Sequence, residues 1–167
     1  MTDELASRVA ATHQEFKSNP SSAQAVFKSE SNVTKGFRSD ISIRQHQLVV
    51  DEPPSIGGDD AGPNPIELVL AALGSCQEIT YKAFGAALGI DVQSVSVQLD
   101  GEINLRGFFG IDEDVRAGFQ NIRGTVTITS SASDEELAKL RDVVNSHCPV
   151  LDMLSTPVPT ELSMRRA

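Results

Sequence analysis

The chain has 167 residues, of which 40% are hydrophobic and 22% charged, and this suits one globular domain with or without a short appendage. Its net charge of -9 argues against nucleic-acid binding, which needs clustered Lys and Arg. No segment approaches the roughly 18 to 20 apolar residues that span a bilayer. We therefore expect no nucleic-acid partner and no membrane partner. The start of the chain lacks a basic region followed by an apolar one, so we expect a cytoplasmic location.

The chain contains two cysteines, Cys76 and Cys148, and three histidines. Two cysteines are too few to staple a secreted scaffold of this length, so they are either inert buried thiols or a redox pair. Because the sequence has neither a CxxC nor an HxxxH spacing, a zinc site has little support. We expect no metal and no organic cofactor.

The N-terminal region has the pattern of a short amphipathic helix. Apolar residues recur at helical spacing, and an Asn-Pro pair at Asn19 closes the segment. This predicts a helix over residues 3–17. It belongs to an N-terminal helical extension (1–20), which precedes the main domain (21–167).

Strands and a long loop are predicted next. Ile41 and Ile43 alternate with polar residues in a region of strand character that extends to Val50. Residues 51–63 contain Pro and Gly too often for regular structure. These residues are predicted to form a long loop, and long loops in compact domains are often functional.

The best-marked helix runs from Asn64 to Gly89. Asn64 is a favoured N-cap residue, a proline occupies the first helical position, and Glu67 stands three residues after the cap, as in a capping box. The first half of this segment is apolar on nearly every side. A helix of that kind is buried, against a sheet or against another subunit.

The rest of the chain is predicted to contain two strands, a helix and a last strand. Apolar alternation marks strands around residues 95–99 and 122–128, with a loop-rich segment between them. A capping box at Ser133 starts a helix whose inward stripe ends at Cys148, and the following proline ends or restarts this helix. In residues 158–164, apolar and polar side chains alternate as in a strand. The predicted fold is α+β, with two helices packed on a curved antiparallel sheet.

Each cysteine taken alone reads as a small buried apolar residue. Taken together, Cys76 and Cys148 lie on the inward faces of two helices that should pack against each other, so their Cα atoms could approach the roughly 5.5–6 Å that a disulfide needs. Redox chemistry needs an attacking thiolate and a second, resolving thiol. Apolar burial alone raises the pKa of a thiol, so a reactive Cys76 would need a nearby cation and, preferably, a carboxylate that holds this cation.

The candidate cations are Arg38, which follows an apparent turn, Arg44, which is predicted to lie inside a strand, and Arg106. Each is also explained as an ordinary surface charge. The candidate carboxylate is Glu67, although a capping box would account for it fully.

Geometry restricts how Glu67 could act. Glu67 and Cys76 are nine positions apart, which places them on opposite faces of an unbroken helix and about 13 Å apart. Either the helix breaks near Gly74, or Glu67 serves the cysteine of a second subunit.

The sequence from Gly62 to Cys76, GPNPIELVLAALGSC, closely resembles the OsmC/Ohr superfamily. The second part of the resemblance is Cys148-Pro149-Val150, and the whole covers about residues 33–164. It implies an OsmC-like fold, with curved antiparallel sheets packed around two central helices in an intertwined homodimer whose active sites lie at the subunit interface.

The resemblance also implies an activity. Cys76 matches the peroxidatic cysteine and Cys148 the resolving cysteine of thiol-dependent peroxidases, which reduce organic hydroperoxides and take part in oxidative stress responses. An external dithiol reductant of the lipoyl type or another kind restores the thiols. Among the activating residues, Arg38 matches the family's arginine best, with Arg44 as the rival. Glu67 lies one position nearer to the cysteine than the family's glutamate.

Two alternatives remain open at this stage. One is a redox sensor that uses the same cysteine pair slowly. The other is a protein that binds a small apolar ligand and has no peroxidase turnover. A hydrolase that combines Cys148 with His147 has less support, because adjacent residues point about 100° apart around a helix.

Overall fold

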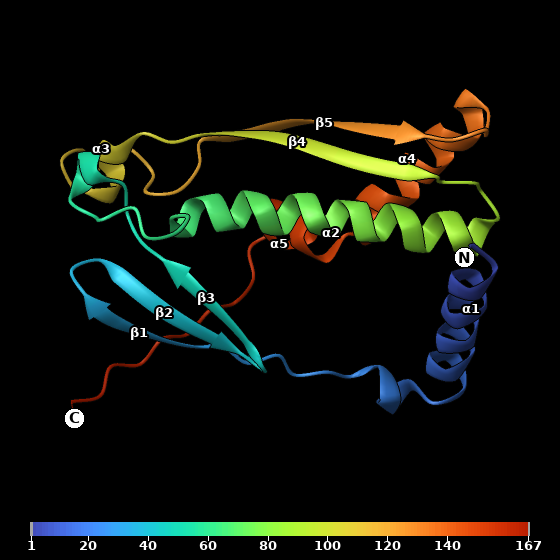
Figure 1. Ribbon diagram of the computed structural model, residues 1–167, viewed down its shortest axis with the longest axis horizontal. Coiled ribbons are helices and arrows are strands. Elements are labelled where there is room, and N and C mark those ends of the chain that lie inside the picture. The colour runs from blue at the N-terminus through green and yellow to red at the C-terminus, as the bar shows by residue number, and fades with distance from the viewer. Residues whose placement is uncertain (1, 167) are drawn as a thin grey trace.

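The structure, a computed structural model, describes residues 2–166, with side chains described from residue 4 onward. It has the mixed α+β composition that the sequence predicts (Figure 1). The helical elements are α1 (Thr2–Ser18), η1 (Pro20–Ala23), η2 (Pro54–Ile56), α2 (Pro65–Leu88), α3 (Leu105–Phe108), α4 (Asp134–His147) and α5 (Pro149–Ser155). The strands are β1 (Glu30–Lys35), β2 (Arg38–Ile43), β3 (His46–Val50), β4 (Ser94–Glu102) and β5 (Asn121–Thr129).

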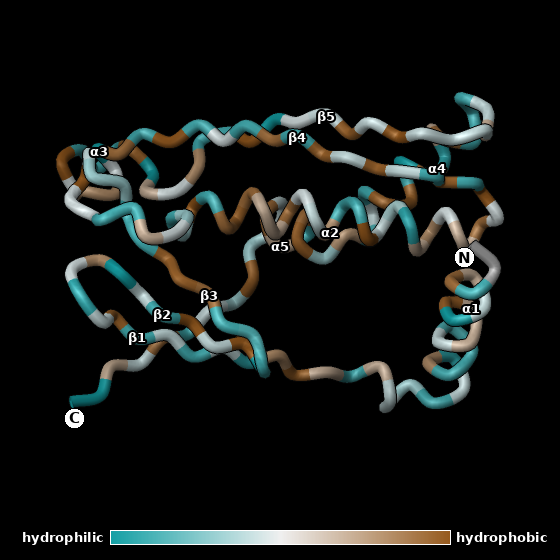
Figure 2. The backbone as a smooth tube through the Cα atoms, in the orientation of Figure 1, coloured by the Kyte–Doolittle hydropathy of each residue, from teal (hydrophilic) through white to brown (hydrophobic). Residues whose placement is uncertain are grey.

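The strands form two separate antiparallel sheets, one with the order β1-β2-β3 and one with the order β4-β5. The long β4-β5 hairpin lies along α2, whereas the three-stranded sheet lies on the other side of this helix (Figure 1). Apolar and polar residues alternate along β4 and β5, as expected for strands with one covered face (Figure 2). The β4-β5 hairpin therefore packs on the helical body, and the three-stranded sheet stands apart from it.

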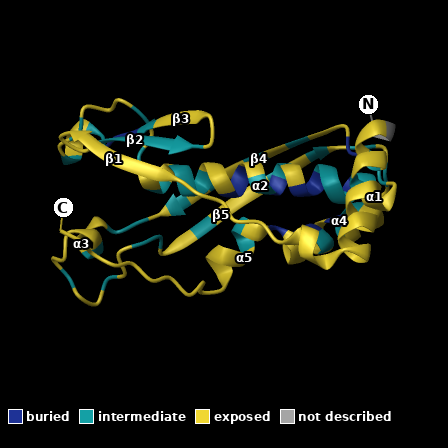
Figure 3. Ribbon diagram, turned by 90° about the horizontal axis from the view of Figure 1, so that it is seen from below, coloured by how far each residue is buried: buried dark blue, intermediate teal, exposed yellow. Residues whose placement is uncertain are grey.

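Helix α2 is the central element of the fold. It contacts β4, α1, α4 and α5, and most of the buried positions gather along it and on the face of α4 that it covers (Figure 3). The main apolar cluster joins Tyr81 of α2 to Val92 and to two fully buried residues of α4, Leu140 and Val144. This cluster fixes α4 against the second half of α2.

The capping signals in the sequence predict the starts of both long helices correctly. Asn64 and Glu67 form a complete capping box at the start of α2, and Gly89 ends that helix in the left-handed conformation with φ of 70°. Ser133 forms the box that starts α4. Cys148 ends α4 and also precedes the first residue of α5, so the proline after it both ends one helix and starts the next.

Helix α1 confirms the helix predicted near the N-terminus. It stands across the C-terminal end of α2 and contacts it, and an extended segment then leads to β1 (Figure 1). Val26 and Phe27 in this segment are 84% and 91% exposed. The segment therefore contributes little to the core of the chain.

Two sequence predictions are wrong in detail. Residues 158–164 form no strand in the structure, and Leu162 and Met164 are 92% and 100% exposed. Alternation makes a segment suitable for a sheet, but a strand also needs a hydrogen-bonding neighbour, and this segment has none among residues 2–166. The region 103–121 is loop-rich as predicted, and within it lies the short helix α3, which Asn104 caps. Arg44 lies in the tight turn between β2 and β3 with φ of +54°, not inside a strand.

Candidate active site

The structure brings Cys76 and Cys148 together. Cys76 lies in the middle of α2 and is partly buried, whereas Cys148 at the α4–α5 junction is fully buried. Their sulfur atoms are 3.3 Å apart, and both cysteines are free thiols. The inward stripe of α4 that includes Leu140 and Val144 continues to Cys148, and the packing of that stripe on α2 carries its sulfur to Cys76.

The surroundings of Cys76 keep its thiol protonated. Burial raises the pKa of Cys76 above its usual value, and the adjacent Cys148 thiol adds to this effect. The backbone N–H of Val150 and the hydroxyl of Thr80 act in the opposite direction and lower the pKa of Cys76. Thr80 is itself buried, and its Oγ1 donates to the Cys76 carbonyl oxygen at 2.7 Å. Together, burial and the adjacent thiol disfavour the thiolate form of Cys76 in the reduced protein.

Glu67 does not share a site with Cys76 of its own chain. Helix α2 is continuous between them, which removes the possibility of a break near Gly74. The Glu67 carboxylate is exposed and accepts a hydrogen bond from the Asn64 backbone N–H at 2.8 Å, while the Glu67 N–H donates to Asn64 Oδ1 at 2.9 Å. Within one protomer, Glu67 serves as the helix cap.

The candidate arginines make their polar contacts away from the thiols. Arg38, at the start of β2, donates to Asp40 and forms an ion pair with it at 3.0 Å. Arg106 pairs with Asp112 at 3.0 Å. Arg44 is exposed in its turn. Neither an ion pair nor a hydrogen bond links any of the three to a cysteine in the part of the chain that the structure describes.

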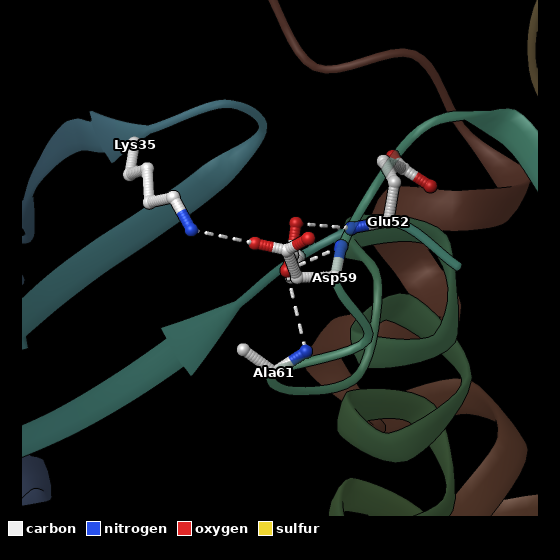
Figure 4. A network of polar contacts seen from close by, with 5 residues as sticks. Lys35, Glu52, Asp59 and Ala61 are labelled. Carbon is white, nitrogen blue, oxygen red and sulfur yellow. Dashed lines mark hydrogen bonds and ion pairs between the residues drawn. The ribbon is translucent and has the colours of Figure 1, made fainter. Parts of the chain in front are cut away.

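Asp51 is a candidate site residue that the sequence patterns did not single out. It lies at the end of β3 and is 2% exposed, and its carboxylate accepts hydrogen bonds from the backbone N–H groups of Glu52, Asp59 and Ala61 at 2.8, 3.1 and 3.2 Å (Figure 4). Burial opposes its ionisation, but these donors and the positive charge of Arg38 together lower the pKa of Asp51 below its usual value. Asp51 thus holds the whole loop before α2 in one shape.

An aspartate at the end of a strand, directly before a loop rich in Pro and Gly, was the signal that could have identified Asp51. Aspartate side chains in such places commonly accept hydrogen bonds from nearby backbone N–H groups. An ion pair between Lys35 Nζ and Asp59 at 3.2 Å ties the same loop to the β1–β2 hairpin (Figure 4). The loop therefore joins the hairpin that carries Arg38 to the start of α2.

Two glycines of this loop are required by close backbone approach. A Cβ atom on Gly58 would lie 1.7 Å from the Glu52 carbonyl oxygen, and one on Gly62 would lie 2.2 Å from the Val49 carbonyl oxygen. Both distances are far below any van der Waals contact. The glycines of the motif before α2 thus let the loop backbone pass close to Val49 and Glu52.

A groove of about 1200 Å³ runs beside the site, between α2, β5, α4 and α5. We call it the α2–β5 groove. Its walls are largely apolar and include Leu73, Leu99 and Leu151, while Gln77, the neighbour of Cys76, contributes an amide. Neither cysteine sulfur forms part of its lining. The groove therefore passes close to the thiols, but the thiols do not open into it in the isolated protomer.

Metal ligands and membrane-spanning helices were sought across residues 2–166. No group of three or more His, Cys, Asp or Glu side chains is arranged to hold a metal ion in that part of the chain. None of the helices within the same range is both long and apolar enough to cross a bilayer.

Solved structures with this fold come from several bacteria. An OsmC-like protein from Mycoplasma pneumoniae superposes with a TM-score of 0.70 at 18% sequence identity, over 80% of this chain and 90% of that one. An organic hydroperoxide resistance protein OsmC from Legionella pneumophila gives 0.62 at 17% identity, over 79% and 90%. An organic hydroperoxide resistance protein from Elizabethkingia anophelis gives 0.62 at 17% identity, over 81% and 91%. At these identities the likeness shows a shared fold.

A comparison of the sequence with protein-family models goes beyond a shared fold. None of the curated proteins compared with the chain matches it. The model of the family described as OsmC-like protein matches residues 57–163, which is most of the chain and includes both cysteines. The chain therefore belongs to the OsmC-like protein family.

Proposed function

We propose that the protein is a thiol-dependent peroxidase that reduces organic hydroperoxides through Cys76 and Cys148. The observation that carries this proposal is the 3.3 Å separation of two free sulfurs at the junction of α2, α4 and α5. Membership of the OsmC-like family supports a peroxide-related role, as do neighbours described as organic hydroperoxide resistance proteins. The details of the mechanism below are our own proposal.

The reaction consists of three steps. The Cys76 thiolate attacks the distal oxygen of ROOH; the O–O bond breaks, the sulfur becomes a sulfenic acid, and the RO⁻ leaving group takes up a proton to give ROH. The Cys148 thiol then attacks the sulfenic sulfur, so that the Cys76–Cys148 disulfide forms and water leaves. An external dithiol, of the lipoyl type or another kind supplied in the cytoplasm, reduces the disulfide and becomes oxidised itself.

Turnover tests this proposal directly. Consumption of cumene hydroperoxide with dihydrolipoamide should be rapid for the natural sequence and abolished in Cys76→Ser. In Cys148→Ser, Cys76 should still react with the peroxide once, but it should not cycle through an intramolecular disulfide. Ser75→Ala, a neighbouring change on the exposed face of α2, is the matched control and should retain turnover. Thiols that stay reduced under excess peroxide would refute the proposal.

Organic peroxides should be preferred over hydrogen peroxide. The apolar side chains of α2 near Cys76 favour a substrate with an apolar body, because burying that body is worth about 25 cal/mol per Å². Equal turnover of cumene hydroperoxide and hydrogen peroxide would contradict this preference.

Arg38 is our first candidate for the cation that stabilises the thiolate, with Arg44 as the rival. The β1–β2 hairpin that carries Arg38 is held by the buried Asp51 loop, whereas Arg44 occupies an exposed turn. We expect Arg38→Met to slow the peroxide reaction more than Arg44→Met does. The reverse order would assign the role to Arg44.

We further propose a homodimer in which Glu67 acts at the partner's thiols. The unbroken α2 prevents Glu67 from reaching Cys76 of its own chain, and Ile79 on the same helix is 69% exposed in the protomer. Apolar side chains are also exposed on the C-terminal segment and on the separate three-stranded sheet. A second copy of the chain would cover this surface.

A mixing experiment tests the shared site. Glu67→Gln keeps an oxygen that can accept the capping hydrogen bond but removes the charge, so it should fold and should lower turnover. Refolding Glu67→Gln together with Cys76→Ser should restore activity, because one site of the mixed dimer then joins an intact Cys76 to an intact glutamate. A monomeric native mass would contradict the dimer, and a mixture as inactive as its parents would contradict the shared site.

A second function is favoured by the α2–β5 groove and by the raised pKa of Cys76. A groove of about 1200 Å³ is large enough for a small apolar ligand, and a thiol with a raised pKa, such as that of Cys76, is a poor nucleophile. Native mass spectrometry of the purified protein would reveal a bound ligand. A slow redox sensor built on the same pair is separated from a peroxidase by kinetics, because sensing tolerates a slow peroxide reaction and turnover does not.

A further inference from the structure

The α2–β5 groove contains two buried polar side chains that lack a partner of their own. Gln77 and Tyr81 lie one helical turn apart on α2, both line the groove, and they are only 6% and 2% exposed. Neither side chain makes a hydrogen bond within the part of the chain that the structure describes, and their polar atoms are reached from the groove. A polar group in such a place needs a partner, so these two depend on what occupies the groove.

The groove changes character along α2. The residues of this helix that line it recur three and four positions apart, on one face: Ile66, Val69 and Leu73 are apolar, and Gln77 and Tyr81 follow them. The fifteen positions from Ile66 to Tyr81 correspond to about 22 Å along the helix. The groove therefore suits an elongated molecule with an apolar body and a polar group at one end.

Helix α4 adds a cation and an amide to the polar end. Tyr81 packs in one cluster with Leu140 and Val144 of α4. The residue directly after each of these two, Arg141 and Asn145, lines the groove. The end of the groove at Tyr81 is thus rich in groups that donate hydrogen bonds.

The charges along the groove favour an anion. The charged residues that line it are three arginines, Arg116, Arg123 and Arg141, and one aspartate, Asp134, in a chain whose net charge is -9. Two of the arginines form ion pairs with exposed carboxylates, and exposed pairs of this kind are weak. The groove is therefore a positively charged surface on an acidic protein.

A different face of α2 is available to a second copy of the chain. Ser75 and Ile79 are exposed and lie one turn apart. Ile79 is two positions from both Gln77 and Tyr81, which is about 200° around the helix. The dimer proposed above would cover the face of Ile79, and the groove lies on the other side of α2.

We propose that the α2–β5 groove binds an elongated anionic amphiphile, with its apolar body along Val69 and Leu73 and its anionic group at Gln77, Tyr81 and Arg141. The proposal rests on the ligand-binding alternative described above and adds the chemical class of the ligand. It is independent of peroxide turnover, because neither cysteine sulfur lines the groove. Burial raises the pKa of Tyr81, so its hydroxyl stays protonated and can donate to an anion.

Fluorescence titration with two related probes tests this proposal. Anilinonaphthalene sulfonate and phenylnaphthylamine share an aromatic body, and only the first carries a negative charge. We expect the sulfonate to bind about tenfold more tightly. Tyr81→Phe removes only a hydroxyl and Arg141→Gln only a charge, and each should weaken binding of the sulfonate about fivefold while leaving the uncharged probe within about twofold.

Two controls locate the anionic group. Lys139→Gln removes the same charge from α4, but Lys139 pairs with Glu135 and does not line the groove, so both probes should bind as before. Arg116→Gln removes a charge from the groove away from Tyr81 and should weaken the sulfonate less than Arg141→Gln does. Circular dichroism checks that each variant is folded.

Several results would overturn the proposal. Equal affinity for the two probes would remove the anionic site but leave the ligand-binding alternative, whereas no binding of either probe would remove both. Sulfonate affinity that is unchanged in Tyr81→Phe and Arg141→Gln would place the probe elsewhere. Affinity that rises as dilution separates a dimer into monomers would assign the groove to the second copy. Neither probe reacts with a thiol, so the peroxidase stands or falls by its own assay.

Discussion

Oxidation of the reduced protein with one equivalent of cumene hydroperoxide should make the folded chain more stable. Cys76 and Cys148 are 72 positions apart, and closing a loop of that length lowers the entropy of the unfolded chain by an amount worth about 4 kcal/mol at 25 °C. The sulfurs must approach from 3.3 Å to about 2.05 Å, which draws the α4–α5 junction toward α2 and costs part of this gain. The net gain in the free energy of unfolding should be about 2–4 kcal/mol.

Urea unfolding followed by circular dichroism measures this gain. The oxidised protein is compared with protein kept in dithiothreitol, at equal protein concentration because a dimer's stability depends on it. Cys148→Ser is the matched control, because it can form no internal disulfide. Peroxide treatment should therefore not raise its free energy of unfolding. An oxidised protein that is no more stable than the reduced one would refute the reasoning. The two thiols would then be neighbours that cannot close a disulfide without distorting the helix junction.

Four further outcomes are expected. Leu140→Ala removes most of a fully buried side chain from the cluster between α2 and α4, and urea unfolding should show a free energy of unfolding about 2–5 kcal/mol lower. A decrease below about 1 kcal/mol would contradict the central place of Leu140 in this cluster. Gly58→Ala places a Cβ against the Glu52 carbonyl and should strongly lower the melting temperature, while Gly118→Ala, with ordinary contacts, should leave it nearly unchanged. The lowered pKa of Asp51 means that its carboxylate stabilises the fold above the ordinary aspartate pKa and that this stability is lost as the pH falls through the folded-state pKa. Asp51→Asn should therefore be less stable at pH 7 and less sensitive to acid in unfolding experiments at a series of pH values. Because burial raises the pKa of Cys76, its peroxide reaction in Cys148→Ser should still be accelerating between pH 7 and pH 9; stopped-flow rates that are flat over that range would contradict this.

Local chemistry explains what the sequence predicts well. The start of α2 depends on Asn64 and Glu67, and that of α4 depends on Ser133, all within one turn of the residues that they cap. The inward stripe of α4 depends on residues three and four apart. Two helices with facing apolar stripes pack together, and for that reason the closeness of Cys76 and Cys148 could be predicted from the sequence.

Long-range contacts explain what the sequence did not predict. The segment 158–164 has the alternation of a strand, but whether it pairs depends on a neighbouring strand that alternation does not specify. Asp51 owes its burial to backbone N–H groups up to ten positions later in a folded loop.

Mass spectrometry of the reduced protein after one equivalent of cumene hydroperoxide would decide whether the cysteine pair is a peroxidase. We expect one cumyl alcohol for each protomer, the loss of two hydrogens from the chain, and a proteolytic peptide pair joined through Cys76 and Cys148. In Cys148→Ser the same treatment should leave a sulfenic acid on Cys76 that dimedone traps. Unconsumed peroxide with both thiols intact would contradict the proposed function and leave an OsmC-like fold that binds a ligand without the chemistry.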